Sequence, residues 1–160
     1  MLAKNIDLTG KCILVTGAAG FIGANLVMEL LRTVRDVRIV GIDNMNDYYD
    51  VALKEYRLKQ IEEIAAGVTG QFTLIKGSIA DKELVNQCFA QYQPGVVVNL
   101  AAQAGVRYSI ENPDAYMQSN MMGFYHILEA CRHYPVKHLV FASSSSVYGG
   151  NDKGLQAQLR

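Results

Sequence analysis

The sequence predicts an α/β fold with a doubly wound parallel sheet. Five short runs rich in Val, Ile and Leu alternate along the chain with stretches in which apolar residues recur at helical spacing. Within the runs the apolar residues are consecutive, which is typical of strands buried on both faces in a parallel sheet. The length of 160 residues is that of one domain. We therefore expect one sheet of five strands with helices packed on both faces.

The first half of the chain contains three of the expected strands and two helices. The strands cover residues 11–17 (KCILVTG), 37–43 (VRIVGID) and 71–77 (QFTLIKG). After the first strand a helix is predicted by apolar residues at helical spacing, namely Phe21, Leu26, Val27, Leu30, Leu31 and Val34. Residues 51–67 predict the next helix, because a glycine ends the segment and one side is apolar, with Leu53, Leu58, Ile61 and Ile64.

The second half continues the same alternation. Residues 81–92 predict a helix in which Asp81 is the N-cap. The fourth strand is expected at 95–102 (GVVVNLAA) and the fifth at 137–143 (KHLVFAS). Between them a long helix is expected from Asp114, because apolar residues recur at spacings of four and three, at Met117, Met121, Phe124, Leu128 and Cys131.

Composition argues against several functional classes. The chain has 15 basic and 15 acidic residues, so it lacks the positive charge expected of a nucleic-acid-binding protein. It has no apolar run long enough for a membrane span and no apolar segment of a secretory signal near its N-terminus. Cys12, Cys88 and Cys131 lie far apart in apolar segments, which favours reduced thiols over disulfides or a zinc site. The histidines show no metal-ligand spacing. We expect a cytoplasmic protein without a metal.

A glycine-rich segment, TGAAGFIG at residues 16–23, joins the first strand to the first helix. Gly17, Gly20 and Gly23 would allow a tight turn, close approach of backbone N–H groups to a pyrophosphate, and close packing of the helix on the strand. Three glycines alone fit any strand–helix turn. Asp43, however, ends the second strand, where an acid meets the adenosine ribose hydroxyls of a dinucleotide. The combination predicts a Rossmann-type site for NAD, since a carboxylate there repels the 2′-phosphate of NADP.

Four segments resemble the extended short-chain dehydrogenase/reductase family, specifically its NAD-dependent nucleotide-sugar epimerases. They are ILVTGAAGFIGANLV, GIDNMNDYYD, VVNLAAQAGVRYSIENPDAYMQSNMMGF and KHLVFASSSSVYGG. The stretch AGVRYSIENP after NLAAQ is most similar to UDP-glucuronate 4-epimerases. The resemblance extends to about Asp152. It implies binding of NAD and of a nucleotide sugar, with UDP as the expected nucleotide, and transient hydride transfer at C4 of the sugar.

The resemblance also implies which residues bind the cofactor. They would surround the pyrophosphate, the adenosine ribose, the adenine and the loop after the fourth strand, with one supporting asparagine in the long helix. In chain order they are Gly17, Gly20, Phe21, Ile22, Gly23, Asp43, Asn44, Asn46, Ser78, Ile79, Leu100, Ala101, Ala102, Gln103 and Asn120. Ser78 departs from the family, which usually has an acid there for the adenine amino group. A hydroxyl is a weaker acceptor by about 1 kcal/mol.

Ser144 matches the catalytic hydroxyl of the family, four residues before Tyr148 and next to Ser143, Ser145 and Ser146. In such enzymes the serine hydrogen-bonds the reacting sugar oxygen, while a Tyr-x-x-x-Lys pair transfers the proton. The serines could alternatively be polar residues that end a strand. The sequence contains no Tyr-x-x-x-Lys, because none of its tyrosines has lysine four positions later. The chain therefore has the appearance of a cofactor domain that ends before the pair, and we expect it to be inactive alone.

Residues 1–152 are accordingly interpreted as the NAD-binding domain, and 153–160 as a tail unlike the family's continuation. An uncovered strand edge and the apolar side of the long helix favour self-association into a homo-oligomer. Two alternatives stay open. One is another nucleotide-sugar dehydratase or epimerase, although 4,6-dehydratases usually have Asp-Glu where this chain has Ser145 and Ser146. The other is a non-catalytic NAD-binding module.

Overall fold

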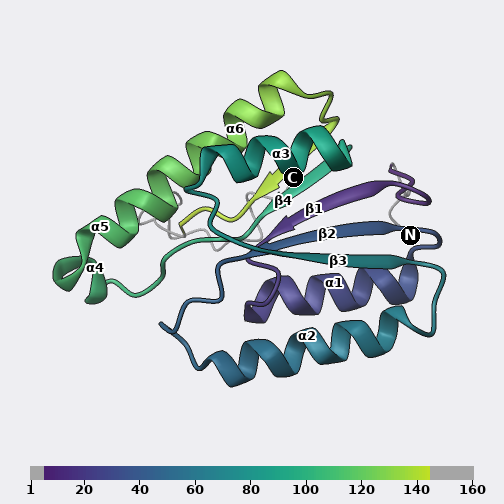
Figure 1. The fold of residues 1–160 in the computed structure, drawn as a ribbon, viewed down its shortest axis with the longest axis horizontal. Coiled ribbons are helices and arrows are strands. Elements are labelled where there is room, and N and C mark those ends of the chain that lie inside the picture. The colour runs from purple at the N-terminus through teal and green to yellow at the C-terminus, as the bar shows by residue number, and fades with distance from the viewer. Residues whose placement is uncertain (1–5, 145–160) are drawn as a thin grey trace, which may run out of the picture.

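The computed structural model describes residues 6–144 and confirms the predicted fold class. One parallel sheet contains the strands in the order β3-β2-β1-β4-β5 (Figure 1). The strands are β1 (Cys12–Thr16), β2 (Arg38–Asp43), β3 (Gln71–Lys76), β4 (Val96–Asn99) and β5 (His138–Phe141). They begin and end within the predicted ranges, and the fourth is much shorter because residues 100–103 leave the sheet.

Helices cover both faces of the sheet. Helices α1 (Phe21–Thr33) and α2 (Val51–Ala65) pack together on one face, and α3 (Lys82–Tyr92) and α6 (Phe124–His133) on the other (Figure 1). Alternate residues of β1 enter two separate cores. Ile13 and Val15 pack on the α1–α2 side, while Cys12 and Leu14 pack on the α3–α6 side. This two-sided burial explains why the strand is apolar at every position.

The long helix expected from Asp114 is not uniform. It begins as α5 (Pro113–Tyr116), continues as a π-helical segment (Met117–Gly123) and ends as α6. The side chain of Asn112 accepts a hydrogen bond from Ala115 N at 3.2 Å and caps the start. A short helix that the sequence did not predict, α4 (Tyr108–Glu111), precedes it.

Gly123, at the end of the π-helical segment, allows close contact with the loop after β3. A Cβ atom there would lie 2.6 Å from Ile79 Cγ1, which is well inside van der Waals contact. Any larger residue would push the helix away from this loop. The sequence pattern identified the apolar positions of the long helix but not this contact.

The cysteines lie as expected of unpaired thiols. All three are free; Cys12 and Cys88 are buried and Cys131 is half-buried. Burial raises the pKa of Cys88 and of Cys131 to about 11. Burial also raises the pKa of Cys12, although the nearby Arg38 acts in the opposite direction. At neutral pH the thiols are therefore protonated and weakly nucleophilic.

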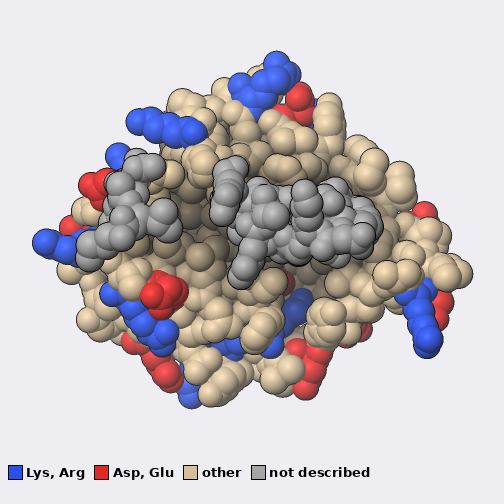
Figure 2. Space-filling model, turned by 180° about the vertical axis from the view of Figure 1, so that it is seen from behind, with Lys and Arg blue, Asp and Glu red and all other residues tan. Residues whose placement is uncertain are grey.

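Three further features bear on function: possible metal-ligating groups, possible membrane-spanning helices and the distribution of charged side chains. Residues 6–144 contain no group of His, Cys, Asp and Glu that could hold a metal ion. Within the same range no helix is both long and apolar enough to cross a bilayer. Figure 2 shows acidic and basic side chains interspersed around the margin of one face, in keeping with the balanced composition.

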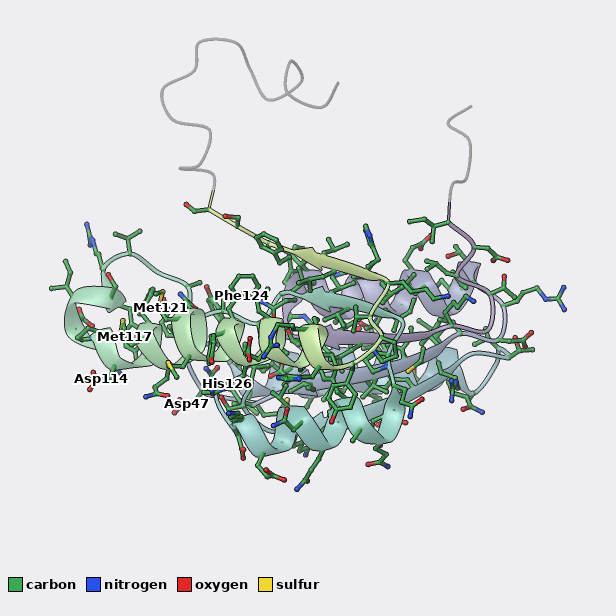
Figure 3. All side chains as sticks on the ribbon, turned by 90° about the horizontal axis from the view of Figure 1, so that it is seen from above. Asp47, Asp114, Met117, Met121, Phe124 and His126 are labelled. Carbon is green, nitrogen blue, oxygen red and sulfur yellow. The ribbon has the colours of Figure 1, made fainter. Side chains whose placement is uncertain are left out.

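The outer side of the long helix and the last strand expose apolar side chains. Met117 and Met121 are exposed on this long helix, and the half-buried Phe124 follows them (Figure 3). The Phe124 ring lies 5.1 Å from that of Phe141 in β5, between ring centroids. Phe141 is itself half exposed, and β5 is the edge strand of the sheet. Met117, Met121, Phe124 and Phe141 together form a surface that we call the Met117–Phe141 face. The sequence predicted that this surface would be uncovered.

Candidate dinucleotide site at the carboxyl edge of the sheet

A cavity of about 450 Å³ opens where the carboxyl ends of the strands meet. Its wall contains residues that directly follow or end all five strands, such as Gly17, Asp43, Gly77, Leu100 and Ala142. Ligands of open α/β sheets bind in this position. All the residues expected at the cofactor line the cavity except Asn120.

The glycine segment forms the floor of the cavity. Gly17 has φ +68°, and a Cβ there would lie 3.0 Å from Ala101 N, so both its conformation and its surroundings require glycine. Helix α1 begins directly afterwards with Gly20 as its N-cap, and no side chain caps it. Its first N–H groups and positive dipole end therefore face a cavity with room for a phosphate. This geometry fits a dinucleotide pyrophosphate.

Asp43 is buried at the end of β2 and is held from two directions. Its Oδ2 accepts a hydrogen bond from Ala19 N at 3.0 Å, and its Oδ1 accepts one from Met45 N at 2.9 Å. The carboxylate thereby joins the glycine segment to the loop after β2. Carboxylate oxygens have several acceptor positions, so these two bonds leave capacity for ribose hydroxyls.

Lys54 is a site residue that the sequence analysis missed. Its Nζ lies 3.6 Å from Asp43 Oδ1 and donates to Asn46 O at 2.9 Å and to Asn46 Oδ1 at 3.0 Å. The apolar side of α2 was expected to include Leu53, but Leu53 is half exposed. The buried residues of α2 are Lys54, Leu58 and Ile61. A lysine one helical turn before Leu58, in line with the buried residues, was the available signal.

Thr16, at the end of β1, fixes the opposite wall. Its Oγ1 donates to Asn99 Oδ1 at 2.7 Å and accepts from Leu100 N at 3.1 Å and from Ala101 N at 3.0 Å. Both Thr16 and Asn99 are buried. The threonine therefore directs the chain out of β4 and into the cavity wall. The sequence analysis included Leu100 and Ala101 but not the residue that positions them.

Asn120 supports the wall from outside. Its Oδ1 accepts from Gln103 N at 2.8 Å, and its Nδ2 donates to Gln103 O at 3.0 Å. It lies in the π-helical segment, and its neighbour Ser119 lines the cavity instead. The geometry thus places Asn120 where it positions Gln103. Its expected supporting role fits this position better than direct cofactor contact.

The loop after β3 places Ser78 and Ile79 at the far side of the cavity. Ser78 Oγ accepts a hydrogen bond from Ala80 N at 3.1 Å, which stabilises the turn. The buried His126 in α6 lies with Nδ1 3.2 Å from Ile79 O. Because a carbonyl only accepts, Nδ1 carries the proton in this contact. This contact joins α6 to the loop after β3.

A tyrosine cluster that the sequence analysis did not predict forms one rim of the cavity. The Tyr48 ring lies 4.7 Å from that of Tyr49 and 4.9 Å from that of Tyr108, between centroids. Tyr116 donates a hydrogen bond to Gly105 O. Reduced solvation, together with the neighbouring tyrosines, raises the pKa of Tyr116. Tyr48 and Tyr49 line the cavity and offer it aromatic surface.

Ser144 lies exposed after β5, two residues beyond Ala142, which lines the cavity. The hydrogen bond from Ala142 N to Asn99 O, at 3.2 Å, extends the pairing of β5 with β4 up to this point. The neighbouring Ser145, Ser146 and Tyr148 lie outside the described residues, as does the tail at 153–160. The catalytic role of Ser144 stays a prediction.

Comparison with known proteins supports the expectation from the sequence. A protein-family model described as "GDP-mannose 4,6 dehydratase" matches residues 14–158. The chain belongs to the NAD-dependent epimerase/dehydratase family of extended short-chain dehydrogenases/reductases.

The relatives within this family are longer proteins. Over 139 residues the chain is 50% identical to protein CapI of Staphylococcus aureus, covering 87% of this chain and 39% of the relative. It is 46% identical to UDP-glucuronate 4-epimerase 4 of Arabidopsis thaliana, covering 90% of this chain and 31% of the relative. The chain thus spans roughly a third to two fifths of the length of these family members.

A solved structure of another family member shows the same fold. It is a UDP-glucuronic acid 4-epimerase variant from Bacillus cereus, in complex with NAD and UDP-4-deoxy-4-fluoro-glucuronic acid. The TM-score is 0.77 at 32% identity, over 93% of this chain and 45% of that one. The fold of this chain is therefore one that has been solved with NAD bound in another family member.

The glycine segment gives a direct test of the cavity floor. A Cβ at Gly23 would lie 2.1 Å from Gly17 O, so we expect Gly23→Ala to lower the free energy of unfolding by about 2 kcal/mol. Gly95→Ala is the matched control, because nothing lies within 4 Å of its added Cβ. Urea unfolding followed by circular dichroism measures both. A rise of about 1 kcal/mol in the free energy of unfolding of Gly23→Ala, as helix propensity alone would give, would contradict the tight turn.

Proposed function

We propose that this chain is the NAD-binding part of a nucleotide-sugar epimerase, with UDP-glucuronate as the expected substrate class. The observation that carries the proposal is the pairing of an uncapped α1 N-terminus with the buried Asp43 across one cavity. The curated relatives include UDP-glucuronate 4-epimerases, and a structural neighbour was solved with NAD and a UDP-sugar analogue.

In this proposal each part of NAD has a place. The N–H groups of Phe21, Ile22 and Gly23 would hold the pyrophosphate, and Asp43 would accept hydrogen bonds from the adenosine ribose hydroxyls. Ser78 and Ile79 would lie beside the adenine, and residues 100–103 would flank the rest of the cofactor. When bound, NAD would accept a hydride from C4 of the sugar and return it to the opposite face of that carbon.

The chemistry of the sugar needs a base that this chain does not supply. Ser144 would hydrogen-bond the reacting oxygen, but the sequence contains no Tyr-x-x-x-Lys. The chain by itself is therefore proposed to bind NAD without sustained epimerisation. This absence also favours the second candidate function, a non-catalytic NAD-binding module, for the 160-residue chain.

A 4,6-dehydratase is the nearer alternative within the family, and the matching family model has that name. Ser145 and Ser146 occupy the positions where such dehydratases usually have Asp-Glu, which favours the epimerase. The identity of 46% to UDP-glucuronate 4-epimerase 4 also favours the epimerase.

NAD binding is the first test. We expect the chain to bind NAD and Asp43→Ala to weaken the affinity about tenfold, because a hydrogen bond to a charged group is lost. Asp47→Ala is the control, since Asp47 is an exposed acid in the same loop (Figure 3). Isothermal calorimetry gives the dissociation constants, and circular dichroism verifies folding. Equal NAD affinities in the two variants would exclude Asp43 as the ribose ligand.

Turnover is the second test. With UDP-glucuronate and NAD supplied, we expect no sustained conversion to the C4 epimer, because no phenol–lysine pair is present to move the proton. Chromatography of the nucleotide sugars after long incubation measures this. Epimer that accumulates beyond one equivalent of protein would contradict the proposal and indicate another base.

Self-association is the third test. We propose that the Met117–Phe141 face pairs with a second copy of the chain, because it combines exposed methionines with an edge strand. Sedimentation velocity is expected to show mass increasing with concentration, and Met121→Glu is expected to reduce it. Val68→Glu, at an exposed position just after α2, is the control. A monomer at all concentrations would overturn this pairing.

A further inference from the structure

The ribose end of the cavity contains a buried ion pair. The side chains of Asp43 and Lys54 are 6% and 7% exposed, respectively. A buried ammonium group needs acceptors, and all those of Lys54 lie between residues 43 and 46: Asp43 Oδ1, Asn46 O and Asn46 Oδ1. The charge of Lys54 is therefore fixed beside the carboxylate that is proposed to bind the ribose.

A second cation lies one turn further along α2. Arg57 lines the same cavity, its Nη1 lies 3.4 Å from Ala19 O, and its guanidinium lies 5.9 Å from the centre of the Phe21 ring. Among the described residues that line the cavity, only Asp43, Lys54 and Arg57 are Asp, Glu, Lys or Arg. The cavity lining thus contains one acidic side chain, that of Asp43, and two basic ones, those of Lys54 and Arg57.

This balance changes what Asp43 does to a 2′-phosphate. An isolated carboxylate in a cavity repels a phosphate strongly, because water is partly excluded. A carboxylate whose charge is cancelled by a fixed ammonium still accepts hydrogen bonds from ribose hydroxyls but repels a phosphate much less. The expectation that repulsion by Asp43 alone favours NAD over NADP is therefore incomplete.

We propose that Lys54, by cancelling the charge of Asp43, sets how strongly the ribose subsite discriminates NAD from NADP. The inference rests on the proposed function, since it requires a dinucleotide in this cavity. Asp43 is the ligand of the 2′-hydroxyl, and Lys54 is a specificity residue whose positive charge offsets, at the 2′-position, the repulsion between that carboxylate and a phosphate. In the wild-type chain the preference for NAD is correspondingly moderate, and removal of Lys54 sharpens it.

The measured quantity is the ratio of the dissociation constants for NADP and NAD in the full chain. We expect Lys54→Met to raise this ratio about tenfold, because the unpaired carboxylate then repels the 2′-phosphate. Lys54→Arg keeps the charge and is expected to retain the wild-type ratio. Lys59→Met is the matched control, since Lys59 is exposed on the same helix.

A purely structural role for Lys54 gives a different result. If Lys54 only holds the loop at residues 43–46, Lys54→Met weakens NAD and NADP by the same factor and the ratio stays constant, which overturns the proposal. Circular dichroism shows whether Lys54→Met folds. Because it leaves a buried carboxylate unpaired, the same comparison is repeated in an Asp43→Asn background, where no such charge remains.

In that background Lys54→Met is again expected to raise the ratio, by removing a positive charge next to the 2′-phosphate, and an equal ratio overturns the proposal. Failure of the proposed function gives a separate result, because the wild-type chain would then bind neither dinucleotide. That result overturns both proposals, whereas wild-type binding with unchanged ratios overturns the role of Lys54 alone.

Discussion

The hydrogen bond between Thr16 Oγ1 and Asn99 Oδ1 joins the ends of β1 and β4, and the cavity depends on it. These strands are neighbours in the sheet, although Thr16 and Asn99 are 83 positions apart. The strand order reverses between them, because the chain first builds β2 and β3 on one side of β1 and then β4 and β5 on the other. Loops leaving such a junction diverge, which opens a crevice. With Leu100 N and Ala101 N also bound to Thr16, the divergence starts at a fixed place.

The other wall of the crevice is organised by charge. Asp43 contacts the glycine segment through Ala19 N, and Lys54 connects the same carboxylate to helix α2. Helices α1 and α2 also pack directly together on this face of the sheet. Asp43 and Lys54 together therefore link β2, the glycine segment before α1, and α2 around the proposed ribose position. Breaking a buried pair of this kind is costly, because the remaining charge has no solvent. Recognition and local stability consequently depend on the same two side chains.

The sequence predicted the sheet, most of the helices and more than half of the cavity wall, because these features follow from local patterns. Consecutive apolar residues indicate buried parallel strands, and glycines followed by a distant acid indicate a dinucleotide turn. The missed features depend on contacts between segments far apart in the chain. The position of Lys54 in line with the buried residues of α2 indicates burial, but nothing local to α2 shows that Asp43 lies opposite. The change of pitch after Tyr116 and the packing of Gly123 on Ile79 have the same origin, since apolar spacing alone does not distinguish α-helix from π-helix.

The residues proposed to bind the cofactor and the residue proposed to act on the sugar lie in different parts of the fold. Every group proposed to contact the pyrophosphate or the ribose lies in or beside β1, β2 and α1, whose positions are fixed by the sheet. Ser144, by contrast, is exposed and follows β5, the edge strand of the sheet. A hydroxyl also needs a base to act on a sugar, and no phenol–lysine pair exists in the sequence. Under the proposed function, dinucleotide affinity is therefore set by the residues of β1, β2 and α1, whereas sugar chemistry would depend on Ser144 together with a proton acceptor, so a change in one need not alter the other.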